Sequence, residues 1–424
     1  MKNKKTLFNF SKICLAFMLA FVFSLAISNT SEAATLGKPT NLKQTYGSYS
    51  TTYGKYYINL EYNRVSGACG YFALMSTDNK NWKFIDEAYQ GTIFTIGDKT
   101  KLNAGSTYYV RILPVFVNEN GELDFDEDDI SDSIQVVTAP ASVSKVIQNG
   151  AGKNSISASW SGVANATGYN VYVKKLGDSS YSFNGSTKSN SYKLTKYKGS
   201  KLKNDYTYYV LVSATKTSTA GFTAESIPSL GYPHYTLPAK ITKFYSSDWK
   251  PGTSKLKLTW KPTMVADGYE LQFYNAKGKS IKKVTTTKDI YTLKNAPKNS
   301  NCSVKIRGYI KTSKGKKYGE WSKKFYFLSQ ADMSKTKYTL YNGILTLRWK
   351  PVTGASKYTV YAGTSASNMK VVATVNGKAT SCSISRINGS AISKYGYYCV
   401  KVVPEKKLGG KTVKGDYKYY WILK

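Results

Sequence analysis

The chain has 424 residues, with 61 Lys and Arg against 25 Asp and Glu, and its formal net charge is +36. A single histidine, His234, excludes a His-rich metal or catalytic centre, and no GxSxG nucleophile motif is present. Composition therefore favours binding over catalysis. An acid–base glycosidase stays open, because paired carboxylates can meet in space without any sequence motif.

The first 33 residues have the form of an export signal. Lys2, Lys4 and Lys5 precede an almost wholly apolar run over residues 13–27, and small residues flank the expected cleavage site after Ala33. An uncleaved N-terminal anchor is the alternative. No later apolar stretch or C-terminal sorting motif follows, so we expect a secreted mature chain without a transmembrane anchor.

Alternating apolar runs then recur along the chain. Four of them end on an aromatic residue, namely Tyr62, Trp160, Trp260 and Trp349. Nine residues after each aromatic, a tyrosine starts a second run, and these are Tyr71, Tyr169, Tyr269 and Tyr358. A third run starts further on, at Tyr108, Tyr208, Cys302 and Tyr398. Alternation of period two predicts strands that bury one face, so each repeat is expected to be a two-sheet sandwich with these aromatic side chains in its core.

This pattern resembles the fibronectin type III family over essentially all of the mature chain. The departures are Tyr62 in place of Trp, Cys302 in place of the Tyr of strand F, and no opening proline in the fourth repeat. The resemblance implies an all-β fold of four tandem fibronectin type III-like antiparallel β-sandwiches after a signal peptide. We expect a signal peptide at residues 1–33, unit one at 34–139, unit two at 140–237, unit three at 238–328 and unit four at 329–424.

The charge of the mature chain points to an anionic partner. Without residues 1–33 it has 57 basic and 24 acidic residues, and five of the basic residues are Arg. Two Gly-containing hairpins of units three and four supply the binding candidates, which are Lys311, Lys314, Lys316, Lys317, Lys406, Lys407, Lys411 and Lys414. Ordinary solvated hairpins are the alternative. No specific nucleic-acid partner is expected, because basic charge alone gives nonspecific affinity and no nucleic-acid motif appears.

The equivalent turn of unit one is acidic instead. Asp124, Asp126 and Asp128 are weak calcium candidates, since a calcium loop would also need a Gly and a distal Glu that are missing. A solvated acidic hairpin, or a docking patch for a basic neighbour, is the other interpretation. No cofactor is expected.

Cysteine and tyrosine give weaker signals. We expect mostly free thiols, with a Cys382–Cys399 disulfide as the alternative. Exposed tyrosines could stack on sugars or simply serve as strand residues, and they are Tyr46, Tyr49, Tyr53, Tyr56, Tyr57, Tyr419 and Tyr420.

Together these features predict a non-enzymatic extracellular adhesion or scaffold protein. Its expected partner is an anionic cell-wall polymer or glycan, or another surface protein. A Lys-rich, Arg-poor composition behind this signal is typical of a Gram-positive bacterium, where the chain would lie on the wall without a covalent link. The alternative is a carbohydrate- or protein-binding accessory component that works beside a separate secreted enzyme.

Overall fold

A computed structural model describes residues 36–88, 91–249, 253–333, 338–415 and 419–422. The predicted signal peptide lies outside the described residues. Strands, turns and one short 3-10 helix, η2 (Glu127–Asp129), form the described part. Within these ranges there is no helix of the length and apolarity needed to cross a membrane.

Unit one contains two antiparallel sheets that face each other. The smaller has the order β1-β2-β5, and the larger has the order β4-β3-β6-β7 with β8 also paired to β6. The strands are β1 (Lys43–Ser50), β2 (Lys55–Glu61), β3 (Gly70–Ser76), β4 (Lys83–Ala88), β5 (Ile93–Ile96), β6 (Thr107–Val117), β7 (Leu123–Asp124) and β8 (Ile134–Val137).

Unit two repeats this arrangement. Its sheets have the orders β13-β10-β9 and β12-β11-β16-β17, with β18 paired to β16, and β14 and β15 form a small extra hairpin. The strands are β9 (Val146–Gly152), β10 (Ser155–Trp160), β11 (Gly168–Lys175), β12 (Ser182–Thr187), β13 (Ser191–Leu194), β14 (Lys196–Tyr197), β15 (Ser200–Lys201), β16 (Thr207–Thr217), β17 (Thr223–Glu225) and β18 (Tyr232–Tyr235).

Unit three has sheets in the orders β19-β20-β23 and β22-β21-β24-β25, with β26 paired to β24. Its strands are β19 (Phe244–Trp249), β20 (Leu256–Trp260), β21 (Gly268–Asn275), β22 (Ser280–Thr286), β23 (Ile290–Leu293), β24 (Asn301–Thr312), β25 (Gly315–Tyr318) and β26 (Phe325–Leu328).

Unit four has sheets in the orders β27-β28-β31 and β30-β29-β34-β35, with β36 paired to β34, and a hairpin of β32 and β33. Its strands are β27 (Thr339–Tyr341), β28 (Ile344–Arg348), β29 (Lys357–Gly363), β30 (Lys370–Asn376), β31 (Ser381–Ile384), β32 (Arg386–Ile387), β33 (Ser390–Ala391), β34 (Tyr398–Leu408), β35 (Lys411–Lys414) and β36 (Tyr420–Ile422). The predicted fold class, an all-β chain of tandem antiparallel sandwiches, is thus confirmed. The residue boundaries between units stay a prediction.

Each sandwich is filled from both of its sheets. All of the aromatic side chains predicted to form the core are buried, including those of Trp260 and Tyr358 with no exposed area. In unit two the rings of Trp160 and Tyr169 meet edge to face, with centroids 5.3 Å apart. Tyr62 of unit one fills the position of the tryptophan and packs on Tyr71 at 4.7 Å in the same way, so the smaller ring preserves the contact.

The core tyrosines also use their hydroxyls. In unit two, the backbone N–H of Val163 donates to the Tyr169 hydroxyl at 2.9 Å, and that of Lys203 donates to the Tyr208 hydroxyl at 2.8 Å. Equivalent pairs occur in the other units, except that Cys302 cannot make the second bond in unit three. Each bond satisfies a turn N–H that would otherwise be buried alone, which stabilises a unit by about 1 kcal/mol. This explains why Tyr rather than Phe stands at these positions.

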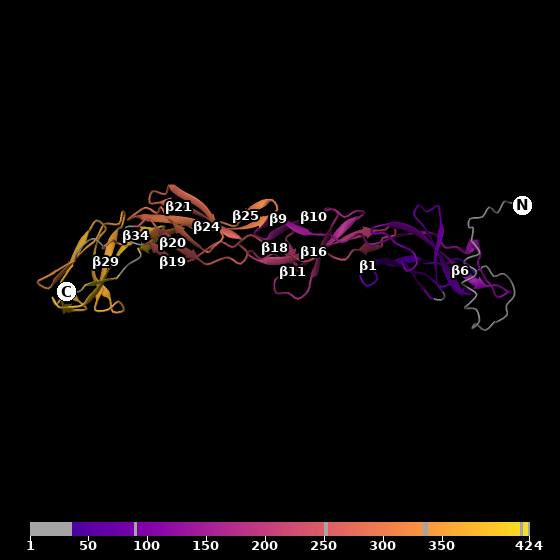
Figure 1. Cartoon of the computed structure of the whole chain (residues 1–424), viewed down its shortest axis with the longest axis horizontal. Helices are drawn as coiled ribbons and strands as arrows, with labels where there is room; N and C mark the ends of the chain where they lie inside the picture. The colour runs from indigo at the N-terminus through magenta and orange to yellow at the C-terminus, as the bar shows by residue number, and fades with distance from the viewer. Residues whose placement is uncertain (1–35, 89–90, 250–252, 334–337, 416–418, 423–424) are drawn as a thin grey trace.

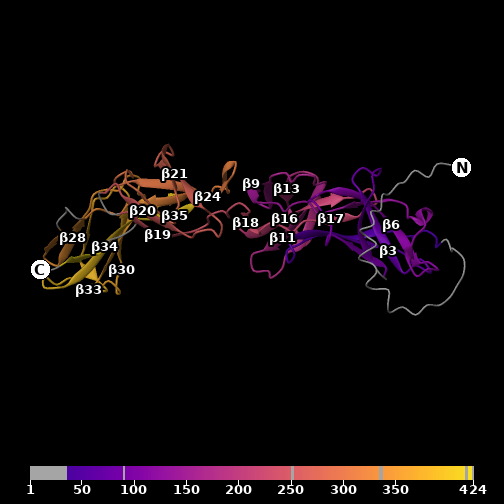
Figure 2. The same ribbon diagram turned by 45° about the vertical axis from the view of Figure 1, so that its right-hand side comes forward.

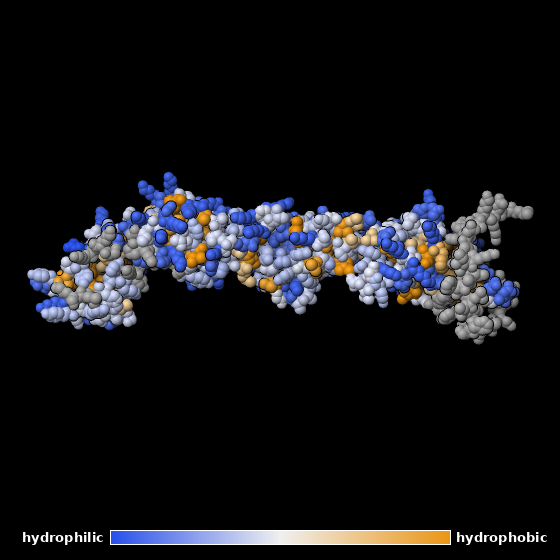
Figure 3. Space-filling view, viewed as in Figure 1, coloured by the Kyte–Doolittle hydropathy of each residue, from blue (hydrophilic) through white to orange (hydrophobic). Residues whose placement is uncertain are grey.

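The four units follow one another along a single long axis. Strand β6 of unit one and β29 of unit four lie at opposite ends of the molecule (Figure 1), and a turn of 45° leaves it extended (Figure 2). Hydrophobic residues form only small separate groups on the face shown in Figure 3, between hydrophilic residues that cover its whole length. A long, narrow shape of this kind exposes most of each unit's side to solvent.

Candidate binding surfaces

The junctions between units are built around one left-handed residue. Gly105, Asp205 and Asn299 each lie three residues before the core residue that starts strand F, and their φ angles are +55°, +57° and +44°. Glycine, asparagine and aspartate tolerate this conformation better than other residues. The turn that it produces lies at the end of the sandwich that faces the next unit.

Each of these residues accepts a hydrogen bond from the following unit. The Lys216 ammonium donates to the Gly105 carbonyl at 2.8 Å, and the N–H of Thr353 donates to the Asn299 carbonyl at 2.7 Å. At the middle junction the side chain of Asp205 acts instead, accepting from the N–H of Met264 at 3.1 Å and from that of Val265 at 3.2 Å.

Strand F is β6, β16, β24 or β34, and the hairpin that joins it to β7, β17, β25 or β35 is here called the FG turn. The FG turn makes the second contact at each junction. In unit two, the N–H of Thr219 donates to the Gln135 side chain of unit one at 2.8 Å. In unit three, the N–H of Ser313 donates to the Gln148 carbonyl of unit two at 3.0 Å. In unit four, Gly409 lies so close to the Tyr326 ring of unit three that an added Cβ would come within 2.7 Å of it. Two separate contacts at each junction restrict bending of the rod.

The candidate lysines of unit three lie on such a turn. Lys311, Lys314 and Lys316 are exposed on the β24–β25 hairpin, and Lys317 is half-buried. The Lys316 ammonium lies 4.4 Å from the centre of the Tyr309 ring. The hairpin stands at the end of its sandwich that faces unit two, and β25 lies near β9 of unit two in Figure 1.

The candidate lysines of unit four differ in their exposure and in their ion pairs. Lys414 pairs with the carboxylate of Glu405 at 3.6 Å, and Lys406 is half-buried with its ammonium against the turn at Gly354. Lys407 and Lys411 are exposed and make no ion pair among the described residues. Unlike Lys414, these two lysines therefore have a charge that no carboxylate of the described residues neutralises.

In unit three, the outer face of the larger sheet has two cations, Arg307 and Lys283, that the sequence analysis did not identify as candidates. Arg307 lies 4.0 Å from the ring centre of Tyr318 and 4.3 Å from that of Trp321. It also pairs at 2.6 Å with Glu270, whose side chain is 7% exposed and meets Lys283 at 3.1 Å. The alternation of β24, which points Arg307 away from the core, was the available signal. Because these cations already have partners, the sheet face offers less free charge than the hairpins.

Unit four also has a buried carboxylate that pairs with lysines, namely that of Glu405. Burial disfavours ionisation of its carboxyl, but the Thr359 hydroxyl and the Lys357 ammonium outweigh this effect and hold the pKa below its ordinary value. Thr359 donates to the carboxylate at 3.0 Å, and Lys357 lies at 3.3 Å. The carboxylate is therefore a fixed structural anion beside the hairpin lysines.

The weak calcium candidates are not brought together into a site. Asp126 caps η2 by accepting from the Asp128 N–H at 2.9 Å, and Asp124 accepts from the neighbouring Phe125 N–H at 2.8 Å. Among the described residues there is no group of three or more His, Cys, Asp or Glu side chains that could hold a metal ion. The neighbouring Asp129 is buried and accepts from the N–H of Leu36 at 2.8 Å, so the acidic turn also fixes the start of unit one.

The tyrosines expected to be exposed fall into two groups. Tyr46 and Tyr53 are 40% and 70% exposed, and Tyr419 is 36% exposed. The expectation is wrong for Tyr420, which packs against the core of unit four, and for Tyr56, which packs against the core of unit one. Tyr49, Tyr56 and Tyr57 are half-buried on the β1–β2 hairpin, where the rings of Tyr49 and Tyr56 lie 4.9 Å apart.

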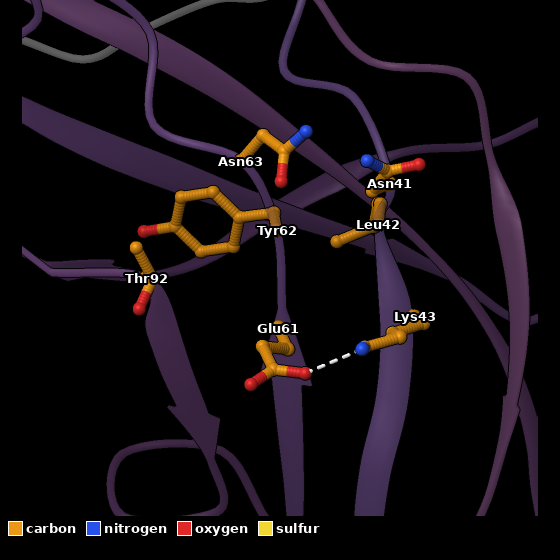
Figure 4. Close-up of a pocket in the computed structure, with 7 residues that line it drawn as sticks. All are labelled: Asn41, Leu42, Lys43, Glu61, Tyr62, Asn63 and Thr92. Atoms are coloured by element: carbon orange, nitrogen blue, oxygen red, sulfur yellow. Dashed lines mark ion pairs between the residues drawn. The ribbon is translucent and has the colours of Figure 1, made fainter.

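A shallow pocket with a volume of about 560 Å³ lies on the surface of unit one. Figure 4 shows the Tyr62 ring between Asn63 and Thr92, with Lys43 paired to Glu61 at 2.7 Å. The pocket has one carboxylate, and a lysine neutralises it. The pocket therefore lacks the two carboxylates that glycoside hydrolysis needs.

The remaining reactive groups are structural. Cys69, Cys302, Cys382 and Cys399 are free, and burial raises the pKa of the Cys302 thiol to about 12. His234 is buried in β18 with its Nδ1 at 2.9 Å from the Tyr232 carbonyl, and burial lowers its pKa although this carbonyl partly opposes the shift. Neither group has the partners that a nucleophile or a general base requires.

The chain was compared with known families, curated proteins and solved structures, and only the solved structures gave a match. No protein-family model and no curated protein matches the chain. Among solved structures it is similar to a crystal structure of chicken CNTN1 FN1-FN3 domains, with 15% identity and a TM-score of 0.29. The likeness covers 69% of this chain and 98% of that chain. The fold of each unit is established by the strand orders of its two sheets.

Proposed function

We propose that the chain is a secreted, non-enzymatic rod that binds an anionic cell-surface polymer. The hairpin lysines of units three and four are its main binding groups. The observation that carries this proposal is the group of exposed, unneutralised cations on these two FG turns, above all Lys407 and Lys411. The excess of 57 basic over 24 acidic residues in the mature chain gives the attraction its range.

The shape of the molecule favours a polymer over a small ligand. Successive hairpins lie along the side of an extended rod, where one flexible polyanion can reach several of them at once. Lysine suits this role, because its ammonium acts as a point charge and imposes little geometry on a phosphate or carboxylate. Weak contacts of this type add up and are strongly sensitive to salt.

A second function, as an accessory component that binds carbohydrate, is favoured by one observation. The ring of Tyr53 is 70% exposed on the β1–β2 hairpin, and Tyr57 lies next to it with ring centroids 6.2 Å apart. Sugar rings stack on aromatic faces without charge. Such binding would persist in salt and fail on Tyr53→Ala.

Co-sedimentation with purified Gram-positive walls, with and without their teichoic acid, tests the first proposal. We expect binding that needs the polymer and declines from about 0.05 to about 0.5 M NaCl. The double variant Lys407→Glu and Lys411→Glu should lose most of it. The matched control is Lys80→Glu with Lys101→Glu, which changes the net charge equally at exposed lysines of unit one. Equal losses in both variants, or binding that ignores salt, would contradict the proposal.

A further inference from the structure

At each of the three junctions, the FG turn of one unit contacts the preceding unit. An FG turn and a surface of the kind that it contacts are also found at the two ends of the rod. The FG turns of units one and two have the same geometry. Asn118 N–H donates to the Glu122 carbonyl at 2.8 Å, and Ser218 N–H donates to the Phe222 carbonyl at 2.8 Å. In unit two this turn docks on unit one.

The contacting residues of that turn are replaced by acids in unit one. Thr219 bonds to unit one, and Phe222 packs with Val137 of unit one at the junction. The equivalent positions in the turn of unit one are Glu119 and Glu122, which are both exposed. Unit one thus presents a docking turn of the same shape with a negative surface.

The surface that receives an FG turn can also be followed from unit to unit. In the last strand of each unit, one residue pairs with the residue directly after the core position of strand F. It is Gln135 in unit one, Pro233 in unit two, Tyr326 in unit three and Trp421 in unit four. In unit two, the FG turn of unit three bonds to Gln148 rather than to Pro233. Gln135 and Tyr326 both contact the FG turn of the next unit. Trp421 is 45% exposed and stacks on Tyr397 with ring centroids 5.2 Å apart.

The end of unit four that points away from unit three has further aromatic and basic residues. Tyr395 occupies the position of Gly105, Asp205 and Asn299, yet it is 81% exposed, whereas those residues are buried or half-buried at the junctions. The Lys394 ammonium lies 4.9 Å from the centre of the Tyr395 ring, and both Lys394 and Arg386 are exposed. The sequence has no Asp or Glu between residues 333 and 404. An exposed aromatic group of this kind is typical of an interface.

We propose that this end of unit four binds the acidic FG turn of unit one in a second copy of the chain, so that the rods associate head to tail. The receiving surface consists of Trp421, Tyr397 and Tyr395, with Lys394 and Arg386 for charge. The docking turn consists of residues 118–122. Such a contact joins two different surfaces, and because these lie at opposite ends of an extended molecule, we expect it to extend into linear chains of rods. It is independent of the polymer-binding proposal.

Sedimentation velocity of the purified mature chain over a concentration series tests the inference, with no other ligand present. The wild type should form dimers and longer species as concentration rises, and these should dissociate as NaCl is raised from about 0.05 to about 0.5 M. The tail variant combines Trp421→Ala with Tyr395→Ser, and the head variant combines Glu119→Lys with Glu122→Lys. Each should weaken association by about tenfold or more.

Mixing the two variants gives the decisive result. The head variant keeps an intact tail and the tail variant keeps an intact head, so an equimolar mixture should form dimers and nothing longer. The control Tyr245→Ser removes an exposed tyrosine of unit three, away from both surfaces, and should associate like the wild type. A wild type that stays monomeric, variants that associate unchanged, or a mixture that forms no dimer would each overturn the inference.

Discussion

Asp205→Ala should uncouple units two and three. The Asp205 carboxylate holds the N–H groups of Met264 and Val265 at 3.1 and 3.2 Å. Because Asp205 is half-buried, we assign about 1 kcal/mol to each of these charge-assisted bonds. Alanine in the left-handed conformation, at φ +57°, costs about 1 kcal/mol more. The junction should therefore lose about 3 kcal/mol.

Amide hydrogen exchange measures this loss directly, because the unfolding of a chain with several units is not two-state. The loss of the two bonds alone, about 2 kcal/mol, corresponds to roughly thirtyfold faster exchange of the Met264 and Val265 amides. Asp205→Gly removes the bonds without the strain and separates the two contributions. The Val163 amide, bonded within unit two to the Tyr169 hydroxyl at 2.9 Å, is the internal control. Unchanged exchange at Met264 and Val265 in the alanine variant would refute this account of the junction.

Three further predictions concern single units. Tyr208→Phe leaves the Lys203 N–H without its partner at 2.8 Å, so unit two should lose about 1 kcal/mol in denaturant unfolding, and no change would show that the bond is dispensable. The Cys302 thiol, with its pKa raised to about 12, should react with a thiol reagent only when unit three opens, and rapid labelling in the folded chain would contradict this burial. Burial lowers the pKa of His234, so the neutral ring contributes stability that is present above its ordinary pKa of about 6.5 and is lost as pH falls below it. Thermal unfolding of unit two should show this loss in the wild type, and a His234→Gln variant with the same pH dependence would disprove it.

The fold could be predicted from the sequence because the residues of each core lie close together in the sequence, within one repeat. Period-two alternation and a constant spacing of nine residues place Trp160 and Tyr169 on facing strands in any sandwich of this kind. Tyr62 kept the same contact with a smaller ring. The failure at Tyr420 has a simple cause, since a tyrosine near the end of a strand looks solvent-facing until its neighbours in the other sheet are known.

The junctions could not be predicted in the same way. A contact between units depends on which turn of one sandwich faces which edge of another, and alternation says nothing about that. A weak signal existed, because Gly105, Asp205 and Asn299 share one position before strand F and all tolerate a left-handed backbone. The ion pair of Arg307 with Glu270 was equally hidden, because the two residues lie on adjacent strands and meet only through the register of the sheet.

The measurement that tests the central claim most directly is the affinity of the mature chain for purified teichoic acid as a function of salt. The account predicts a steep linear fall of log K with log salt. In the Lys407→Glu, Lys411→Glu variant the slope should be smaller by roughly one unit for each polymer phosphate that the protein no longer neutralises. The Lys80→Glu, Lys101→Glu control should keep the slope of the wild type. A flat salt dependence, or identical slopes in all three proteins, would contradict binding through the hairpin lysines.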